Sequence, residues 1–219
     1  MSRIARRRRL IIMGAGRQGR NINDICQVLE IEVIGFLDDT KAPGEDINGV
    51  PVLGGFDRAQ ESALIEQAEW IVGIGDNVIR RRLSREIESR GGTLATIIHP
   101  AGARSPSAVV GKGVYINAFS RLLANTRVGD YALIEGLSSI GTDSVLEEAV
   151  LIGPGCQLTA GCRIGACALI GAGAVVLGGA RVGRHSIIGA GATVVSEIPD
   201  YVLALGTPAR IERQLPRDR

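Results

Sequence analysis

The chain has 219 residues and 45% hydrophobic residues, enough for one large or two small domains with a normal core, which excludes disorder along its whole length. Aromatic residues make up only 3% while glycine contributes 30 residues, so the core must consist of Ile, Val, Leu and Ala packed close to turns, which disfavours a helical bundle. With 25 basic and 23 acidic residues the net charge is +2, and no charge excess marks a nucleic-acid-binding protein.

Residues 1–9 are expected to form a basic tail that ends in four arginines, Arg6 to Arg9, which are solvated or, alternatively, contact an anionic membrane or nucleic acid. The apolar run over residues 10–13 is too short for a signal peptide or a membrane span, so we expect a soluble, cytoplasmic protein. No C-x-x-C pair suggests a metal site, so we expect small buried residues at the four cysteines: Cys26, Cys156, Cys162 and Cys167.

Residues 10–98 alternate between short β-branched runs and stretches of helical period. The predicted strands are residues 10–13, 31–37, 70–74 and 94–98, and the predicted helices are residues 18–29, 57–67 and 77–89. Strands that alternate with helices predict a parallel sheet with right-handed crossovers, a Rossmann-like α/β domain.

A Gly-x-Gly-x-x-Gly motif lies between the first predicted strand and helix. It comprises Gly14, Gly16 and Gly19, and Asp38 and Asp39 close the second strand 24 and 25 residues after its first glycine. Glycines permit the tight turn, and the free N–H groups at the helix start attract a pyrophosphate. Taken alone, the motif suggests a dinucleotide such as NAD, or a turn that is only structural.

From residue 99 onward the helical period disappears and a six-residue repeat takes its place. Fifteen aliphatic residues recur at this spacing: Val110, Ile116, Leu122, Val128, Ile134, Ile140, Leu146, Ile152, Leu158, Ile164, Ile170, Val176, Val182, Ile188 and Val194. A small residue stands two positions before each of them, and glycine often follows. Three hexads make one triangular coil of a parallel β-helix, so residues 99–219 are predicted to hold five stacked coils.

The flat faces of such a prism must be solvated or paired with another subunit, and a homotrimer with cyclic symmetry would bury them. The repeat breaks at residues 197–200, and residues 206–211 are predicted to cap the last coil. Residues 212–219 are expected to form a short polar tail.

The order of these motifs resembles that of the hexapeptide-repeat nucleotide-sugar acyltransferases, similar to the bacillosamine and perosamine N-acetyltransferases and the sialic acid O-acetyltransferase. The resemblance covers roughly residues 10–212 and rests on the glycine motif, Ile98-His99-Pro100, the hexads, Gly-Ala-Gly-Ala-Thr-Val-Val at 189–195 and Gly-Thr-Pro-Ala-Arg at 206–210. It implies a left-handed β-helix, a trimer, and acetyl-CoA bound as acyl donor between neighbouring β-helices, with no metal.

The resemblance also assigns binding residues. The N-terminal domain would hold a nucleotide-linked sugar through Gly14, Gly16, Arg17, Gly19, Asp38 and Asp39. The pantetheine arm of acetyl-CoA would run along Gly153, Gly171 and Gly189, with Ala190, Gly191 and Arg210 nearer the adenine and 3′-phosphate.

The histidine pair of the family is missing from the matching positions. Acyl transfer from a thioester needs a base for the proton of the nucleophile, normally His. The family carries it in an aliphatic-Glu-His-Asp motif, nine residues before a second His. Here Thr142 and Leu151 occupy those places, and the acid Asp143 remains.

Three interpretations stay open at this point. In the first, the chain is an acyltransferase whose base is Asp143, Glu147, Glu148 or Glu135, or whose amine substrate arrives deprotonated. In the second, it is a catalytically silent relative that binds a nucleotide sugar or assembles with other enzymes. In the third, its β-helix serves a different acyl or ligand chemistry. His99 is expected to be structural, and His185 to be exposed and idle, or else a relocated base.

Overall fold

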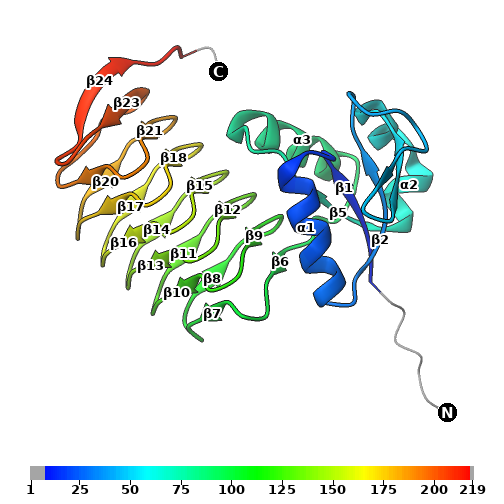
Figure 1. Ribbon diagram of the computed structural model, residues 1–219, viewed down its shortest axis with the longest axis horizontal. Coiled ribbons are helices and arrows are strands. Elements are labelled where there is room, and N and C mark those ends of the chain that lie inside the picture. The colour runs from blue at the N-terminus through cyan, green and yellow to red at the C-terminus, as the bar shows by residue number, and fades with distance from the viewer. Residues whose placement is uncertain (1–7, 218–219) are drawn as a thin grey trace.

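The computed structural model describes residues 8–217 and contains two parts, an α/β domain and a triangular β-helix (Figure 1). In the α/β domain the elements are β1 (Arg9–Met13), α1 (Arg17–Val28), β2 (Glu32–Leu37), β3 (Asp46–Ile47), β4 (Val50–Gly54), the 3-10 helix η1 (Phe56–Gln60), α2 (Ser62–Gln67), β5 (Glu69–Val72) and α3 (Asn77–Ser89). The sheet order is β3-β4-β2-β1-β5, and only the β3–β4 pair is antiparallel. The predicted Rossmann-like parallel sheet is therefore confirmed.

Two sequence predictions for this domain were wrong in detail, and one hairpin was missed. The helix expected over residues 57–67 is divided into η1 and α2, because Glu61 between them is extended (φ −74°, ψ 113°). The β3–β4 hairpin was not predicted, since β3 has only two residues and the turn uses the positive φ of Asn48 and Gly49. The strand expected over residues 94–98 shrinks to β6 (Ile97–Ile98), which pairs with the β-helix rather than with the domain sheet.

The β-helix is a left-handed parallel prism with three faces, named here in the order in which the chain visits them. The first face holds β6 (Ile97–Ile98), β9 (Tyr115–Ile116), β12 (Leu133–Ile134), β15 (Leu151–Ile152), β18 (Leu169–Ile170), β21 (Ile187–Ile188), β23 (Val202–Leu205) and β24 (Arg210–Gln214). The second face holds β7 (Ala103–Arg104), β10 (Arg121–Leu122), β13 (Ser139–Ile140), β16 (Gln157–Leu158), β19 (Val175–Val176) and β22 (Thr193–Val194). The third face holds β8 (Val109–Val110), β11 (Arg127–Val128), β14 (Val145–Leu146), β17 (Arg163–Ile164) and β20 (Arg181–Val182).

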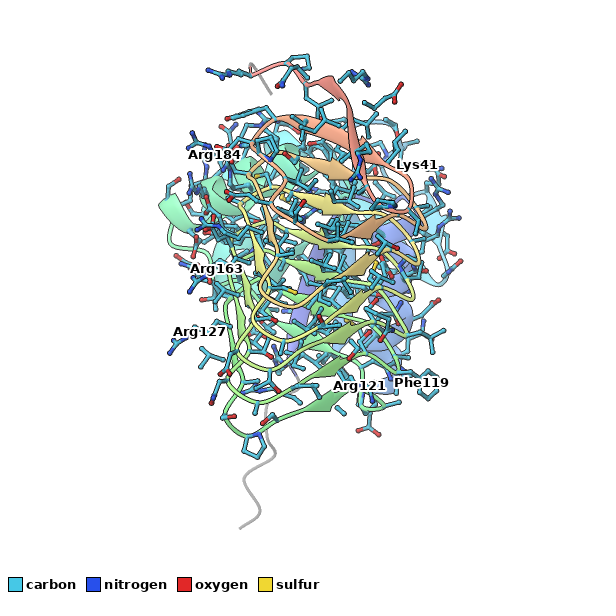
Figure 2. The ribbon with its side chains drawn as sticks, turned by 90° about the vertical axis from the view of Figure 1, so that its left-hand side faces the viewer. Lys41, Phe119, Arg121, Arg127, Arg163 and Arg184 are labelled. Carbon is cyan, nitrogen blue, oxygen red and sulfur yellow. The ribbon has the colours of Figure 1, made fainter. Side chains whose placement is uncertain are left out.

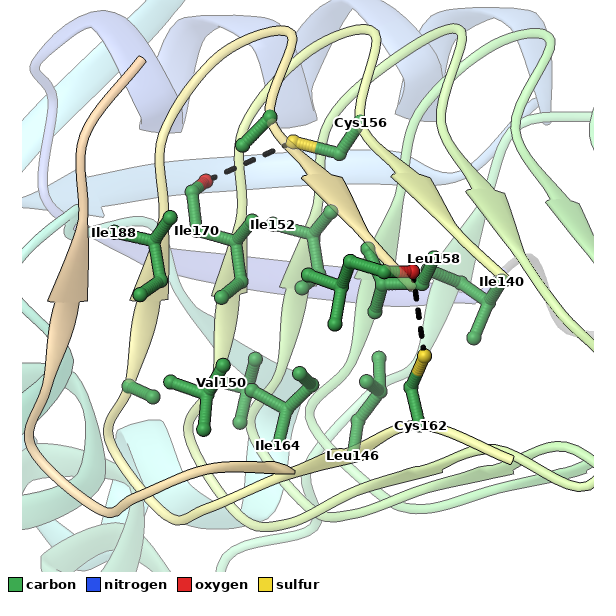
Figure 3. Close-up of a cluster of buried hydrophobic side chains, with 14 of the residues drawn as sticks. Ile140, Leu146, Val150, Ile152, Cys156, Leu158, Cys162, Ile164, Ile170 and Ile188 are labelled. Carbon is green, nitrogen blue, oxygen red and sulfur yellow. Dashed lines mark hydrogen bonds between the residues drawn. The ribbon is translucent and has the colours of Figure 1, made fainter. Parts of the chain in front are cut away.

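The interior of the prism explains both repeat registers (Figure 3). Apart from Val110, which is partly buried, the predicted aliphatic residues are at most 3% exposed and stack in one continuous core. Several of the small residues carry hydroxyl groups that close the corners: Ser138 Oγ donates to Gly153 O (2.9 Å) and Ser186 Oγ to Pro199 O (2.6 Å). A small polar side chain at this register therefore satisfies a turn carbonyl that the core would otherwise leave unpaired. All four cysteines are buried and free, as expected.

Each corner of the prism is a column of residues in the left-handed backbone region. The first corner, between the first and second faces, carries Phe119, Leu137, Gly155, Gly173 and Gly191; the second carries Asn125, Asp143, Gly161 and Gly179; the third carries Gly113, Tyr131, Ala149, Cys167, His185 and Tyr201. Positive φ lets the chain turn sharply after every two-residue strand, and it favours glycine and asparagine.

Both ends of the prism differ from the prediction. The first coil starts before Val110, at β6 and β7. Ile98 stands at an aliphatic position of the repeat, but Arg104 at the following one is not aliphatic, so the sequence pattern begins only at Val110. At the other end, Val182 pairs with Ile198 and Ile188 with Ala204, 16 residues apart instead of 18. The expected polar tail instead contributes to β24, which pairs antiparallel with β23 and covers the end of the first face. Residues 1–7 of the expected basic tail lie outside the described residues; Arg8 pairs with Glu69, and Arg9 begins β1.

The α/β domain packs on the first face and along the third corner. Tyr115 and Leu133 of the first face are fully buried in one core with Ile22 and Ile25 of α1. Helix α3 lies along the third corner, where Asn77 Nδ2 donates to Cys167 O and Ala168 O (both 3.0 Å). Within residues 8–217, the helices and strands of the α/β domain lie away from the second face (Figure 1).

Candidate functional site

The glycine motif lines a pocket of about 460 Å³ at the carboxyl ends of the domain strands. Gly14, Gly16, Arg17, Asp38 and Asp39 line it, five of the six residues that the resemblance assigned to nucleotide-sugar binding; their binding role stays a prediction. Sequence reasoning missed the rest of the lining, which is Gln18, Thr40, Phe56, Gly73, Ile74 and Gly75. The signal was present in Gly73-Ile74-Gly75, a second glycine-rich turn that directly follows β5, although the predicted strand over residues 70–74 had included its first two residues.

The glycines of this motif have different structural reasons. A Cβ on Gly19 would lie 1.8 Å from Gly14 O, and one on Gly73 would lie 2.8 Å from Gly19 Cα, so strand ends and helix start meet backbone to backbone. Gly14 needs its positive φ of 99°. A Cβ on Gly16 would meet nothing within 4 Å, so Gly16 leaves open space at the pocket. Gly19 therefore shapes the pocket without lining it, whereas Gly16 keeps it open.

The two carboxylates hold the pocket loops together. Asp38 accepts hydrogen bonds from Ala15 N (2.7 Å), Thr40 N (2.8 Å) and Thr40 Oγ1 (2.6 Å), and Asp39 accepts one from Phe56 N (2.7 Å). Burial of Asp38 raises its pKa, but the bonds from Thr40 and Ala15 and the charge of Lys41 outweigh it and hold the pKa below its ordinary value. Asp38 therefore stays ionised and ties the loop after β1 to the loop after β2.

The structure does not bring the predicted catalytic residues together. Thr142 and Asp143 lie at the second corner, where Asp143 accepts a hydrogen bond from Asn125 Nδ2 (2.9 Å). Glu147 lies at the other end of β14, accepts from Ala166 N (2.9 Å), and lines a separate hollow of about 760 Å³ on the third face with Arg163 and Arg181.

The other candidate bases also have partners. Glu148 forms ion pairs with Arg81 (3.3 Å) and Arg85 (2.8 Å) across the contact between α3 and the third corner, which we call the seam. Glu135 lies at the start of the first corner and accepts from Asn117 Nδ2 (3.1 Å). Neither is near Thr142 along the prism surface, because the second face separates the first corner from the second, and the third face separates the second from the third.

The two histidines are both engaged. His99 Nδ1 accepts from Ala101 N (3.0 Å), a structural contact of the expected kind. His185 is not idle: its ring is half-buried and stacks on Tyr201 with a centroid distance of 4.9 Å and an interplanar angle of 4°. Burial, then the charges of Arg81 and Arg184, lower the pKa of His185.

At the three glycines expected along the acetyl-CoA arm, a side chain would point into the stack of coils. A Cβ on Gly153 would lie 2.7 Å from Ala172 N, one on Gly171 2.5 Å from Ala190 N, and one on Gly189 2.3 Å from Leu205 Cδ2. Gly153 and Gly171 are therefore required by the backbone of the next coil. The open positions are Gly173 and Gly191 at the first corner, where a Cβ would meet nothing within 4 Å. Arg210 is exposed on β24 and donates to Ala209 O (3.2 Å).

None of the helices among residues 8–217 is both long and apolar enough to cross a membrane. Within the same part of the chain, no three His, Cys, Asp or Glu side chains gather into a group that could hold a metal ion.

The fold and the pocket define a two-domain protein in which a Rossmann-like domain is joined to a hexapeptide-repeat β-helix. Residues 9–87 match the family described as PglD N-terminal domain, and residues 143–178 and 161–196 match bacterial transferase hexapeptide (six repeats). GDP-perosamine N-acetyltransferase of Escherichia coli O157:H7 is 30% identical over 152 residues, which cover 67% of each chain. A 122-residue segment, 55% of this chain, is 29% identical to uncharacterized protein L142 of Acanthamoeba polyphaga mimivirus, but it spans only 23% of that protein.

Solved structures agree over nearly the whole chain. PerB from Caulobacter crescentus in complex with CoA and GDP-perosamine superposes with a TM-score of 0.88 at 32% identity, covering 93% of this chain and 97% of that one. The acetyltransferase domain of PglB from Neisseria gonorrhoeae FA1090 in complex with acetyl coenzyme A gives a TM-score of 0.88 at 32% identity, covering 94% and 99%. The chain belongs to the hexapeptide-repeat nucleotide-sugar N-acetyltransferase family.

Proposed function

We propose that this protein transfers the acetyl group of acetyl-CoA to a nucleotide-linked sugar held in the glycine-lined pocket. The observation that carries the proposal is a pocket at the N-terminal end of α1, whose N-cap Gly16 makes no side-chain capping bond and where helix N–H groups favour an anion. This pocket is joined to a hexapeptide prism in a chain similar to PerB, whose structure holds CoA and GDP-perosamine together. The amine or hydroxyl of the sugar attacks the thioester carbonyl, a C–N or C–O bond forms, the C–S bond breaks, and the CoA thiolate leaves and takes up the proton that the nucleophile loses.

A second candidate, a silent nucleotide-sugar binder, is favoured by one observation. Thr142 occupies the second corner, and a threonine hydroxyl does not act as a base near pH 7. Asp143 beside it is already bonded to Asn125. The two candidates share the nucleotide pocket and differ in whether acetyl transfer occurs.

Calorimetric titration with GDP-, UDP- and dTDP-sugars, with NAD and with acetyl-CoA tests the proposal. We expect a nucleotide sugar and acetyl-CoA to bind and NAD not to bind. We then expect mass spectrometry to detect an acetylated sugar after the protein is incubated with acetyl-CoA and the nucleotide sugar. Micromolar binding of NAD with no binding of any nucleotide sugar overturns the proposal, and binding of the sugar without acetylated product selects the silent binder.

Gly16→Val is expected to weaken nucleotide-sugar binding at least tenfold, because its side chain enters the open space of the pocket without meeting the backbone. Surface changes without lost contacts alter stability by only about 0.5 kcal/mol, so the unfolding midpoint in urea should stay where it is. Unchanged affinity in a folded Gly16→Val protein would place the nucleotide elsewhere.

We further propose a homotrimer with the second face turned inward. Phe119 (68% exposed) and Leu137 (65%) border this face at the first corner, and Leu123, Leu177 and Val195 border it at the second. Figure 2 shows Phe119 beside Arg121 on the opposite side of the prism from Arg127 and Arg163. Exposed apolar side chains along both edges of a flat face favour burial against other copies.

Replacing Phe119 and Leu137 together with glutamate is therefore expected to shift the trimer towards monomer in sedimentation velocity at micromolar concentration. Charged side chains cannot be buried there without partners. Val109→Glu, at an exposed apolar position (54%) on β8 of the third face, is the control and should leave the trimer intact. A wild-type protein that sediments as a monomer contradicts the trimer.

A further inference from the structure

One fully buried side chain, Arg80 of α3, joins the wall of the nucleotide pocket to the β-helix. The residue is 0% exposed, although it lies in an otherwise amphipathic helix. The loop before α3 contains Ile74 and Gly75, which line the pocket, and the third corner of the prism passes on the other side of the helix.

The guanidinium divides its donors between these two parts. Nη1 donates to Ile74 O (2.9 Å) and, at 3.4 Å, to Gly75 O. On the other side, Nε donates to Tyr131 O (2.7 Å) and Nη2 to Ala149 O (2.8 Å), two successive turns of the third corner. A fifth acceptor, Asn77 Oδ1, lies 2.8 Å from Nη2.

The chemistry of this contact requires arginine. The planar fork holds five N–H donors in fixed directions, so a single side chain reaches carbonyl groups of three separate segments. The partners found for Arg80 are carbonyl and amide oxygens, and none is a carboxylate. Burial lowers the pKa of Arg80 to about 10, so the group still carries its proton at neutral pH.

Asn77 extends the same contact to the next turn. Its Nδ2 donates to Cys167 O and Ala168 O while its Oδ1 accepts from Arg80. Three consecutive turns of the third corner are thus hydrogen-bonded to the first turn of α3, which follows directly on the pocket loop.

We infer that Arg80 is a positioning residue for the nucleotide-binding pocket: it fixes the Ile74–Gly75 wall against the β-helix, and through this wall it sets the affinity for the nucleotide. The inference rests on the proposed function, because it requires that the pocket binds a nucleotide-linked sugar. The acyl donor, which the resemblance places along the prism surface, is not expected to contact this wall.

Calorimetry on Arg80→Gln, with the nucleotide sugar that the wild type binds and with acetyl-CoA, separates positioning from general damage. We expect the nucleotide-sugar Kd to rise about tenfold or more while the acetyl-CoA Kd stays within twofold. Arg80→Lys keeps the charge but cannot reach all three segments. Its nucleotide-sugar Kd should therefore lie between those of the wild type and Arg80→Gln. If Arg80→Gln does not fold, Arg80→Lys carries the test.

Arg85→Gln is the matched control. Arg85 lies on the same helix and also crosses the seam, where it donates to Glu148 (2.8 Å) beside Tyr131; within residues 8–217 it has no hydrogen bond to the pocket loop. It should bind both ligands like the wild type. Equal loss of affinity for both ligands in the Arg80 variants, or unchanged nucleotide affinity in a folded Arg80→Gln protein, overturns the inference. A wild type that binds no nucleotide sugar refutes the proposed function instead.

Discussion

Thr142→His is expected to raise the rate of acetyl transfer by about 10²–10⁴-fold, the usual contribution of a general base. Thr142 is half-buried at the second corner, directly before Asp143, and its backbone carbonyl accepts from Gly161 N (2.8 Å). The substitution therefore changes only a side chain at the prism surface. Steady-state kinetics with acetyl-CoA and the nucleotide sugar measure the gain.

Asp143 supplies the second part of this argument. Its Oδ1 accepts from Asn125 Nδ2, which fixes the carboxylate at the corner, and a neighbouring carboxylate orients an imidazole in other acyl-transfer sites. Asp143→Asn in the Thr142→His background should therefore remove much of the gained rate. Thr142→Asn, which adds a polar group without a base near pH 7, is the control and should give no gain.

Two outcomes contradict the expectation. Wild-type turnover that is already fast and is lost on Asp143→Asn or His185→Ala means that the base has moved within this chain. A protein that is inactive before and after Thr142→His, and that does not bind acetyl-CoA, is a silent binder. Leu151 lies on the first face, packed against the core shared with the α/β domain, rather than at the second corner, so a histidine at Leu151 would not reach the ring of Thr142→His within one copy of the chain.

The repeat could be predicted from sequence because each hexad is a local signal. An aliphatic residue every sixth position and a small residue two places earlier both correspond to inward positions, such as Ile152 and Val150. Helix α3 was also predicted to the residue, because the pattern of residues 77–89 is strongly amphipathic. The ends of the prism were not, since Arg104 interrupts the register and the last coil is two residues shorter.

The seam could not be predicted for a different reason. Three arginines follow one another in α3, Arg80, Arg81 and Arg82, and the sequence gives each the same charge and propensity. Only the approach of the third corner buries Arg80 and leaves Arg81 to pair with Glu148 at the surface. The pocket shows the same limit: the glycine turn after β1 is a local motif, but Phe56 reaches the pocket through the unpredicted segment after the β3–β4 hairpin.

Gly171→Ala is expected to destabilise the protein by about 3 kcal/mol, at the upper end of what overpacking costs. The added Cβ would lie 2.5 Å from Ala190 N, 2.7 Å from Gly189 C and 2.7 Å from Ile188 O. All three are backbone atoms of the next coil, which is held at the strand spacing of about 4.8 Å and cannot retreat without losing hydrogen bonds. The midpoint temperature of thermal unfolding, Tm, should therefore fall by about 6–12 °C for a chain of this size.

Gly173→Ala, two residues away, separates the structural role of these glycines from a ligand-binding role. Its Cβ would meet nothing within 4 Å, and the only penalty is the positive φ of 67°, about 1 kcal/mol for an alanine. If acetyl-CoA lies against the open first corner, Gly173→Ala weakens its binding although the fold is nearly unchanged. In Gly171→Ala the new side chain points into the stack and away from a donor at the surface. The acetyl-CoA affinity of the fraction that remains folded should therefore match the wild type. A Gly171→Ala protein as stable as the wild type would mean that neighbouring coils separate far more easily than their hydrogen bonds and close backbone contacts imply.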